Sequence, residues 1–326
     1  MPNGILHYRH IPTLLPRLDE SLLGGVRVGT ITEIVGRAGV GKTQLGLQLC
    51  IAAAHHKRGS IYIDTELKLS VNRLQEIARE RLYHMATTNG GSENNLGMRD
   101  CLEAVQLVLE NVSVHQPQST SELLDGLSKL EEEISLSMMH NSATCAKDDY
   151  GSGRSGMKYP IQLLLLDSIA APLQREYING TAAAAAKRAS ALLQISQVLK
   201  RIAQEWNIAI VVINQVGSSQ LNNSNPDGTN DGIKLERSNY GNDGVFPTAA
   251  LGTAWHHCVS TRLLLEHTRD PHRIESVNEI DSAGNGSIEE EKVRTATIVK
   301  SNAVAKKVIG FQVSKMGIIE ELNKLL

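Results

Sequence analysis

The sequence predicts an α/β fold with a twisted, mostly parallel sheet and helices on both of its faces. Apolar runs of strand length alternate with helical segments along the chain, which is typical of βαβ units. Two of these runs, QLLLLDS (162–168) and IAIVVINQV (208–216), are apolar on both faces, as central parallel strands are. A glycine-rich turn also joins an early strand directly to an apolar helix.

The first third of the chain follows this pattern. TITEIVG (30–36) alternates β-branched residues and predicts a strand, and TQLGLQLCIAAA (43–54) lacks proline and predicts a buried helix. GSIYIDTE (59–66) predicts a second strand that ends in acidic residues, and a helix is expected at about 71–82. We expect the polar, glycine-rich stretch 84–100 to be a solvated loop.

The rest of the chain continues the alternation around further polar insertions. Helices are expected at 102–109, 121–136 and 182–206, and strands at 111–116, 162–168, 208–216, 260–267, 295–301 and 308–318. The insertions cover about 139–158, 217–247 and 275–292. Because loops of such length are usually functional or disordered, we treat them as insertions in one domain, 18–326, that follows a short N-terminal extension, 1–17.

The composition limits the classes of protein to which the chain can belong. With 326 residues and 41% apolar side chains, the chain can bury the core of one large α/β domain or two small ones. Aromatic residues make up only 3%, so the core must be mostly aliphatic. The formal net charge of −2 argues against a broadly basic nucleic-acid surface, so DNA contacts must come from local loops.

Cysteine spacing and hydropathy bear on the cellular location. The four cysteines lie far apart, without metal-like pairing, and we expect them to be reduced, as in the cytosol or nucleus. The first residues lack an apolar run of roughly 7–15 residues, so we expect no signal peptide. No run of about 18 apolar residues occurs, so we expect no membrane span.

The segment GRAGVGKT (36–43) matches the spacing of a phosphate-binding loop. Glycine lets the backbone N–H groups approach a phosphate closely, and the helix that follows directs its positive end at the same anion. Lys42 would reach the terminal phosphates, and the Thr43 hydroxyl would bind Mg²⁺. The alternative, a glycine-rich turn that binds nothing, is disfavoured by the strand before it and the helix after it.

Acidic residues at the ends of two predicted strands suit ATP hydrolysis, because ligands of open α/β sheets lie at the carboxyl ends of strands. Asp167 ends the apolar strand and would hold Mg²⁺; otherwise it only caps the strand. Glu66 is the candidate base that polarises the attacking water, with a surface carboxylate as the alternative. Asp64 would point the same way but ranks lower, because Glu66 is closer to the expected strand end.

The strand IAIVVIN ends in two amides, Asn214 and Gln215, directly before the long polar insertion 217–247. Such an amide can bind the γ-phosphate and pass its loss to the following segment, as in other phosphate-sensing switches. We take Gln215 as this sensor; the alternative is an amide that only caps the sheet.

With these motifs in order, the chain resembles the RecA-type recombinases, and within them the eukaryotic Rad51 paralogues. GRAGVGKTQL, YIDTE, LLLLDSIA and INQV occur in the family's order and spacing. The chain looks most like the B type, through LDESLLGGVRVGTITEIVG (18–36) and AALGTAWHHCVSTRLLLEH (249–267). The resemblance covers about residues 12–318 and implies a RecA-like P-loop NTPase core with antiparallel strands at its C-terminal end.

The resemblance also implies roles for individual residues. The catalytic set would be Glu66, Lys42 and Gln215, and Thr43 with Asp167 would hold the metal. The subunit boundary near ATP would include His257, unless this is a core histidine. Arg73 would lie beside the adenine, unless it is a surface arginine. The nucleotide would be bound by Gly36, Arg37, Ala38, Gly39, Val40, Gly41, Lys42, Thr43, Gln44 and Arg73.

Two segments match the DNA loops of the family, 174–187 and 217–247. The candidate DNA contacts are Arg175, Tyr177, Lys187, Arg188, Lys234 and Arg237. The second segment carries more acidic than basic residues, and phosphate contacts dominate non-specific affinity. We therefore expect the chain to bind single-stranded DNA weakly by itself and partners to supply most of the basic surface.

Two departures from the family are visible. The chain has only about 20 residues before the core, where the family has a small helical domain and a polymerisation contact. The Ser-Pro segment that caps a neighbouring ATP in the recombinase is Ser301-Asn302 here.

The resemblance thus implies a nuclear protein of homologous recombination that is a weak, DNA-dependent ATPase. It would use ATP and Mg²⁺ and work with other recombinase paralogues, the C type first, to load the recombinase filament at double-strand breaks. One alternative is a scaffold whose bound ATP only stiffens an interface. A small-molecule kinase is a weaker alternative, because Glu66 and the INQV strand suit water as the acceptor.

Overall fold

The structure is a computed structural model that describes residues 9–88, 98–143, 157–177, 181–215, 251, 253–268 and 293–321. The insertions expected at 217–247 and 275–292, with Lys234 and Arg237, lie outside the described residues.

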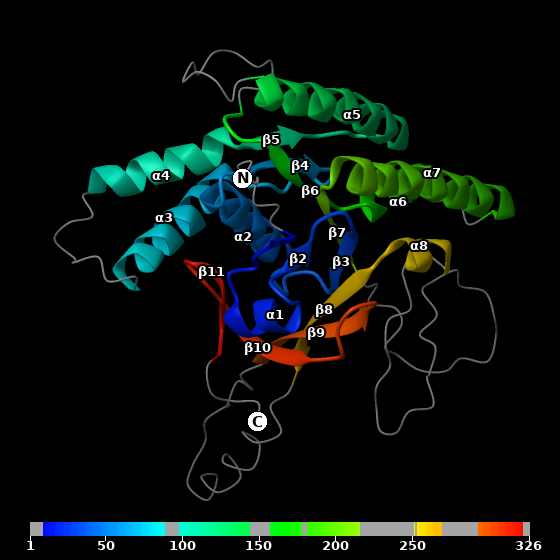
Figure 1. Cartoon of the computed structure of the whole chain (residues 1–326). Coiled ribbons are helices and arrows are strands. Elements are labelled where there is room, and N and C mark those ends of the chain that lie inside the picture. Colours follow the sequence, from blue (N-terminus) through cyan, green and yellow to red (C-terminus); the bar gives the residue numbers. More distant parts are fainter. Residues whose placement is uncertain are drawn as a thin grey trace, which may run out of the picture.

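A nine-stranded sheet forms the centre of the described part of the molecule (Figure 1). In its spatial order, the neighbouring strands from β8 (Thr261–Thr268) to β5 (Val112–His115) run parallel, and β9 (Val293–Ser301), β10 (Val308–Ser314) and β11 (Gly317–Glu320) continue the sheet antiparallel. This confirms the predicted fold class, including the antiparallel strands at the C-terminal end. In spatial order the strands are β11 (Gly317–Glu320), β10 (Val308–Ser314), β9 (Val293–Ser301), β8 (Thr261–Thr268), β3 (Ile31–Gly36), β7 (Ala209–Gln215), β6 (Ile161–Asp167), β4 (Gly59–Asp64) and β5 (Val112–His115).

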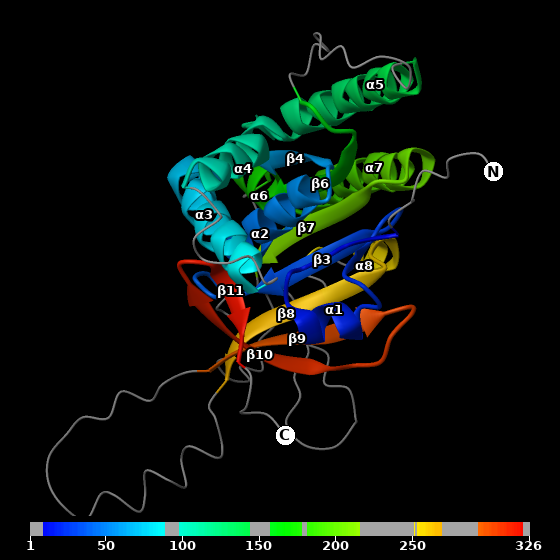
Figure 2. The same ribbon diagram turned by 60° about the vertical axis from the view of Figure 1, so that its left-hand side comes forward.

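Helices cover both faces of the sheet (Figure 2). One face packs against α1 (Pro16–Ser21), α2 (Lys42–His55), α3 (Val71–Thr88) and α4 (Met98–Glu110). The other packs against α5 (Thr120–Ala143), α6 (Ala170–Glu176), α7 (Ala182–Trp206) and α8 (Thr253–Cys258). In the described part of the chain, no helix has the length and apolarity needed to cross a membrane.

Strand β6 shows how one sequence serves both layers. Leu163 and Leu165 lie in the first core cluster, whereas Leu164 and Leu166 lie in the second, and all four are fully buried. Because successive side chains of a strand point to opposite faces, a strand between two helical layers must be apolar throughout.

The N-terminal segment is part of the same packed unit. Strands β1 (His10–Ile11) and β2 (Val26–Arg27) form a small antiparallel pair, and Ile11 and Leu15 are buried in the first core cluster. Helix α1 crosses the expected boundary at residues 17 and 18. Described residues of the expected extension 1–17 therefore pack against the same core as the rest of the chain.

Several element boundaries differ from expectation. Helix α3 continues to Thr88 and α4 begins at Met98, so the described ends of the stretch expected as a loop, 84–88 and 98–100, are helical. Helix α5 continues to Ala143, into the expected insertion. The segment 308–318 was expected as one strand, but it forms the hairpin of β10 and β11, with Gly317 at a φ of +81°.

A buried ionic group connects the central strand β3 to its neighbours. Glu33 is fully buried and pairs with Arg262 of β8 at 2.6 Å. The Glu33 carboxylate also accepts hydrogen bonds of 2.8 Å from Asn214 Nδ2 of β7 and Trp255 Nε1 of α8. Breaking such a pair on one side leaves a buried charge, so this group fixes how these four elements meet.

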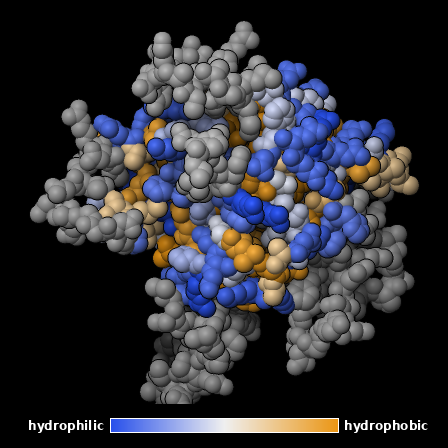
Figure 3. Space-filling model, in the orientation of Figure 1, coloured by the Kyte–Doolittle hydropathy of each residue, from blue (hydrophilic) through white to orange (hydrophobic). Residues whose placement is uncertain are grey.

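Hydrophilic side chains cover most of the described surface on the face shown in Figure 3, with smaller apolar areas between them. Exposed apolar residues lie apart in the chain, for example Leu23 in the turn after α1 and Leu193 in α7, which is ordinary for a folded protein surface.

Candidate active site

The loop between β3 and α2 is shaped by its glycines. A Cβ on Gly36 would lie 2.3 Å from the Leu265 carbonyl oxygen of β8, so only glycine allows the two strands to lie this close. Gly39 and Gly41 have φ angles of +77° and +119°, which favour glycine. A Cβ on Gly39 would meet nothing within 4 Å. The loop is therefore tightly packed at its start and open at Gly39.

Lys42 lies back across this loop. Its ammonium donates hydrogen bonds of 2.8 Å to the carbonyl oxygens of Gly36 and Arg37. Burial lowers the pKa of Lys42, and the nearby charges of Asp167 and Glu66 act in the opposite direction. The side chain of Val40, one of the predicted nucleotide-binding residues, is buried in the first core cluster, which leaves its backbone N–H for a phosphate contact.

Thr43 and Asp167, the two residues predicted to hold the metal, are in direct contact. The Thr43 hydroxyl donates to Asp167 Oδ2 at 2.8 Å, and the Tyr62 hydroxyl donates to the same oxygen at 2.9 Å. Burial raises the pKa of Asp167, while these two hydrogen bonds act to lower it. The site thus holds a hydroxyl and a carboxylate side by side at the carboxyl end of β6.

Glu66 lies beside Gln215. The Gln215 amide donates to both Glu66 oxygens, at 3.0 and 3.3 Å, and the Ser168 hydroxyl donates to Oε1 at 2.8 Å. Lys68 forms an ion pair with the same carboxylate. Burial alone would raise the pKa of Glu66, but the hydrogen bonds from Lys68, Ser168 and Gln215 together outweigh it and lower the pKa.

Asp64 has a different role from the one expected. It is itself the last residue of β4, so Glu66 lies in the turn beyond the strand, not at its end. The Asp64 carboxylate is buried and accepts hydrogen bonds from the backbone N–H groups of Lys68 and Leu69 and from Gln116 Nε2. Asp64 therefore stabilises the turn that presents Glu66.

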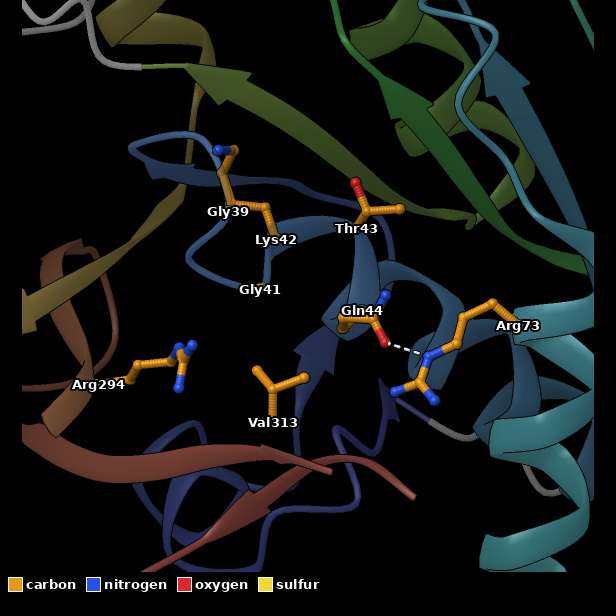
Figure 4. Close-up of a pocket in the computed structure, with 8 residues that line it drawn as sticks. All are labelled: Gly39, Gly41, Lys42, Thr43, Gln44, Arg73, Arg294 and Val313. Atoms are coloured by element: carbon orange, nitrogen blue, oxygen red, sulfur yellow. Dashed lines mark hydrogen bonds between the residues drawn. The ribbon is translucent and has the colours of Figure 1, made fainter. Parts of the chain in front are cut away.

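A pocket of about 370 Å³ opens beside the loop (Figure 4). Arg73 is fixed at one side of it, where Nε donates to Gln44 Oε1 at 2.7 Å and Nη2 donates to the Ser314 carbonyl oxygen at 2.5 Å. None of the described residues that line the pocket is acidic, so the pocket suits an anion. Its lining consists of Gly39, Gly41, Lys42, Thr43, Gln44, Arg73, Arg294 and Val313.

In the described part of the expected DNA loop 174–187, residues 174–176 belong to α6 and residues 182–187 belong to α7. Arg175 is in α6 and donates to the Thr65 carbonyl oxygen at 3.0 Å, and Tyr177 packs partly against the second core cluster. On α7, Lys187 is exposed and Arg188 is half-buried. The interface candidate His257 is exposed at the end of α8 and makes an edge contact with His256.

Sequence reasoning missed several residues that the structure brings to this site. Tyr62 and Ser168 stand within the strand motifs already recognised, so their polar side chains were the available signal. Arg294 and Val313 come from β9 and β10. Nothing in the sequence connects these two residues with a loop more than 250 positions earlier.

These residues fit a nucleotide with its magnesium ion. The open backbone at Gly39 leaves room for phosphate, and the pocket carries the cationic side chains Lys42, Arg73 and Arg294. Mg²⁺ is usually held by one or two side chains together with substrate phosphates, and Thr43 and Asp167 supply such a pair.

The family model for Rad51 matches residues 9–99 and 150–291, which is more than half of the chain. The chain belongs to the Rad51 family. The match spans β3, the glycine loop, β4, β6 and β7, and so includes every element that carries the site described above, apart from β9 and β10 at the pocket.

Named relatives fall within the same family. The chain is 29% identical over 270 residues to a human protein named DNA repair protein RAD51 homolog 2, and this covers 79% of the chain but only 60% of the human protein. It is 27% identical over 317 residues to the DNA repair protein XRCC3 homolog of Arabidopsis thaliana, covering 95% of the chain and 92% of that protein. The archaeal DNA repair and recombination protein RadB of Methanosphaera stadtmanae is 28% identical over 201 residues, covering 62% of the chain and 66% of RadB.

Proposed function

We propose that this protein is a Mg²⁺-dependent ATPase of recombinational DNA repair, acting in the nucleus with other recombinase paralogues, the C type first. In such a complex it would help to load the recombinase filament on single-stranded DNA at double-strand breaks. The observation that carries the proposal is the adjacency of two pairs, Thr43 with Asp167 and Glu66 with Gln215, at one edge of the sheet. The names of its relatives, which are DNA repair proteins, support the cellular role.

The phosphate chain would be bound by the backbone N–H groups of residues 36–43. Lys42 now donates to two loop carbonyls, and a phosphate oxygen would replace these neutral acceptors with a charged one, to which hydrogen bonds are stronger. Thr43 and Asp167 would hold Mg²⁺, which supplies neutralisation of the phosphate charge. Arg73 would stand beside the base.

Glu66 would orient the attacking water. Its lowered pKa keeps the carboxylate ionised at neutral pH, so it accepts a hydrogen bond from water, though as a weak base. Gln215 donates to the same carboxylate and would exchange this contact for the γ-phosphate. In this way the state of the nucleotide would reach the segment that follows β7.

The first candidate DNA segment touches the same turn. Arg175 of α6 donates to the Thr65 carbonyl oxygen, one residue before Glu66. A DNA phosphate that drew Arg175 away would release this turn, which is a physical route for DNA-dependent hydrolysis. We keep the expectation that DNA binding by the chain alone is weak and sensitive to salt.

A second candidate function is an ATP-binding scaffold that does not hydrolyse. The specific observation in its favour is that Glu66 already has three partners, Lys68, Ser168 and Gln215, which compete with a water molecule. In that case bound ATP would stabilise the fold and its interfaces by mass action.

Phosphate release separates the two functions. The complex is purified from the protein's own cells, its partners are identified, and release is compared among wild type, Glu66→Gln and Lys42→Ala. We expect Glu66→Gln to retain ATP binding and to lose about 10²-fold or more in rate, and Lys42→Ala to lose both. Equal release from all three supports the scaffold. A wild-type protein that is folded but takes up no adenine nucleotide in titration calorimetry contradicts both functions.

A further inference from the structure

Arg294 stands in the candidate pocket without a described partner for its Nε. It lies in β9 and lines the pocket together with Gly41 and Gln44. Figure 4 shows its side chain extending into the pocket from the side opposite Arg73, with Val313 between the two arginines. The antiparallel part of the sheet thus brings its own cation to the phosphate loop.

The two arginines differ in how their donors are used. Each of the three guanidinium nitrogens of Arg73 donates a hydrogen bond to a protein acceptor: Gln44, Glu76 and the Ser314 carbonyl oxygen. The Nε of Arg294 is buried, and it has no hydrogen-bond partner among the described residues. A buried donor without an acceptor is costly, so Arg294 is placed to receive an acceptor from a ligand.

The chemistry of that acceptor follows from the pocket. The planar fork of arginine matches pairs of phosphate oxygens, and the loop beside it is built to hold phosphate. Lys42 and Thr43 line one part of this pocket, whereas Glu66, Gln215 and Asp167, which would act at the γ-phosphate and the metal, do not line it. Arg294 accordingly lies where the phosphate chain leaves the loop through Gly41 and Gln44.

We propose that Arg294 binds the α-phosphate of the nucleotide and is a binding residue of the site. This inference rests on the proposed function, because it requires a nucleotide in the loop. It also assigns a task to the C-terminal strands: β9 supplies a charge to the phosphates and β10 supplies the apolar side chain of Val313.

Three ligands test the assignment by calorimetry with the wild-type protein and Arg294→Gln. ATP, ADP and inorganic tripolyphosphate all offer an equivalent of the α-phosphate, so we expect similar losses of about 10- to 100-fold for all three. A loss for ATP alone would place the contact at the γ-phosphate and overturn the proposal. A loss for ATP and ADP but not for tripolyphosphate would place it at the ribose or base, and this would overturn the proposal as well.

Matched variants separate a direct contact from general charge. Lys307→Gln removes one exposed positive charge from the turn between β9 and β10 and should leave all three affinities unchanged. Arg294→Lys keeps the charge without the fork and should lose part of the affinity; it carries the test if Arg294→Gln does not fold. Equal losses in Lys307→Gln and Arg294→Gln, or wild-type affinity in Arg294→Lys, overturn the contact. Nucleotide binding by the wild type alongside unchanged Arg294 variants contradicts only this inference, whereas no binding by the wild type contradicts the proposed function.

Discussion

At the scale of single residues, Asp167 shows a conflict between stability and binding. Its carboxylate is buried at the end of β6, and burial raises its pKa because the charged form loses contact with water. Hydrogen bonds from Thr43 and Tyr62 offset this only in part. The site therefore keeps a charge that the folded protein would hold more easily in neutral form, as metal-binding positions often do.

Asp167→Asn should stabilise the protein in the absence of nucleotide and metal. The folded-state pKa is above the unfolded one, so the folded state binds more protons, and wild-type stability falls as pH rises through that interval. Asparagine has no such penalty and can still accept both hydrogen bonds. The free energy of unfolding, measured by urea, should exceed the wild-type value at pH 7 and approach it near pH 3. A variant less stable than wild type at pH 7 would contradict this account, and calorimetry should show that Mg-ATP binding is weakened.

The residues that sequence reasoning found are those that a local rule could place. Thr43 and Asp167 were expected to meet because carboxyl ends of parallel strands share one edge. The strand end was misplaced: the strand was taken to run two residues too far, which put Glu66 at its end, where the structure has Asp64. The buried contacts of Glu33 could not be predicted either, because its partners Arg262 and Trp255 lie more than 200 residues away in the sequence.

At the scale of elements, the structural effect of glycine differs between the end of a strand and the interior of a helix. A side chain at Gly36 would clash with the backbone of β8, and backbone cannot relieve the clash by changing rotamer as a side chain can. Gly126, inside α5, is half-buried, and a Cβ added there would meet nothing within 4 Å. The first glycine sets the spacing of two strands, and the second only loosens a helix.

Alanine at these two positions should therefore have opposite effects. Gly126→Ala should raise the free energy of unfolding by about 1 kcal/mol, because alanine favours the helix and limits the unfolded chain. Gly36→Ala should lower it by roughly 1–3 kcal/mol through overpacking between β3 and β8. Urea unfolding of both variants measures the sign of the change in the free energy of unfolding for each. A stabilised Gly36→Ala protein would mean that the two strands are not held this closely.

Elements with clear ends were predicted well, and short ones were not. Helix α7 was expected at 182–206 and found at Ala182–Trp206, with Thr181 accepting from the Ala184 N–H before it and Asn207 in a left-handed conformation after it. Helix α6 was missed because seven residues give too little periodicity. The turn between β10 and β11 was missed although Ser314, Lys315 and Gly317 stand at it, because apolar residues continue on both sides.

At the scale of the whole molecule, buried polar side chains connect segments from the two ends of the chain. Arg81 of α3 donates to the carbonyl oxygens of Leu14, Met316 and Ile318. Burial lowers the pKa of Arg81 to about 10, which leaves it charged at neutral pH. The parallel core could be predicted from its apolar strands. These long-range contacts could not be predicted, because they join residues that only the three-dimensional fold brings together.

Arg81→Met should destabilise the protein by at least about 2 kcal/mol, because three carbonyl groups lose a shared buried donor. The exposed arginine two positions earlier, in Arg79→Met, serves as the control, since a surface ion pair such as that with Glu80 contributes less than about 1 kcal/mol. Thermal and urea unfolding of the two variants measure the difference. Equal stabilities would show that Arg81 does not hold the two segments together.

The hairpin of β10 and β11 also predicts the effect of mutations that truncate this protein late in its sequence. A premature stop or a proteolytic cut after residue 307 would remove the described residues 308–321. Arg73 would then lose its hydrogen bond to the Ser314 carbonyl, and Arg81 would lose its hydrogen bonds to two carbonyl groups of the hairpin. The pocket would also lose Val313. Late truncations should therefore abolish nucleotide binding as completely as lesions in the glycine loop, although they leave that loop's sequence intact.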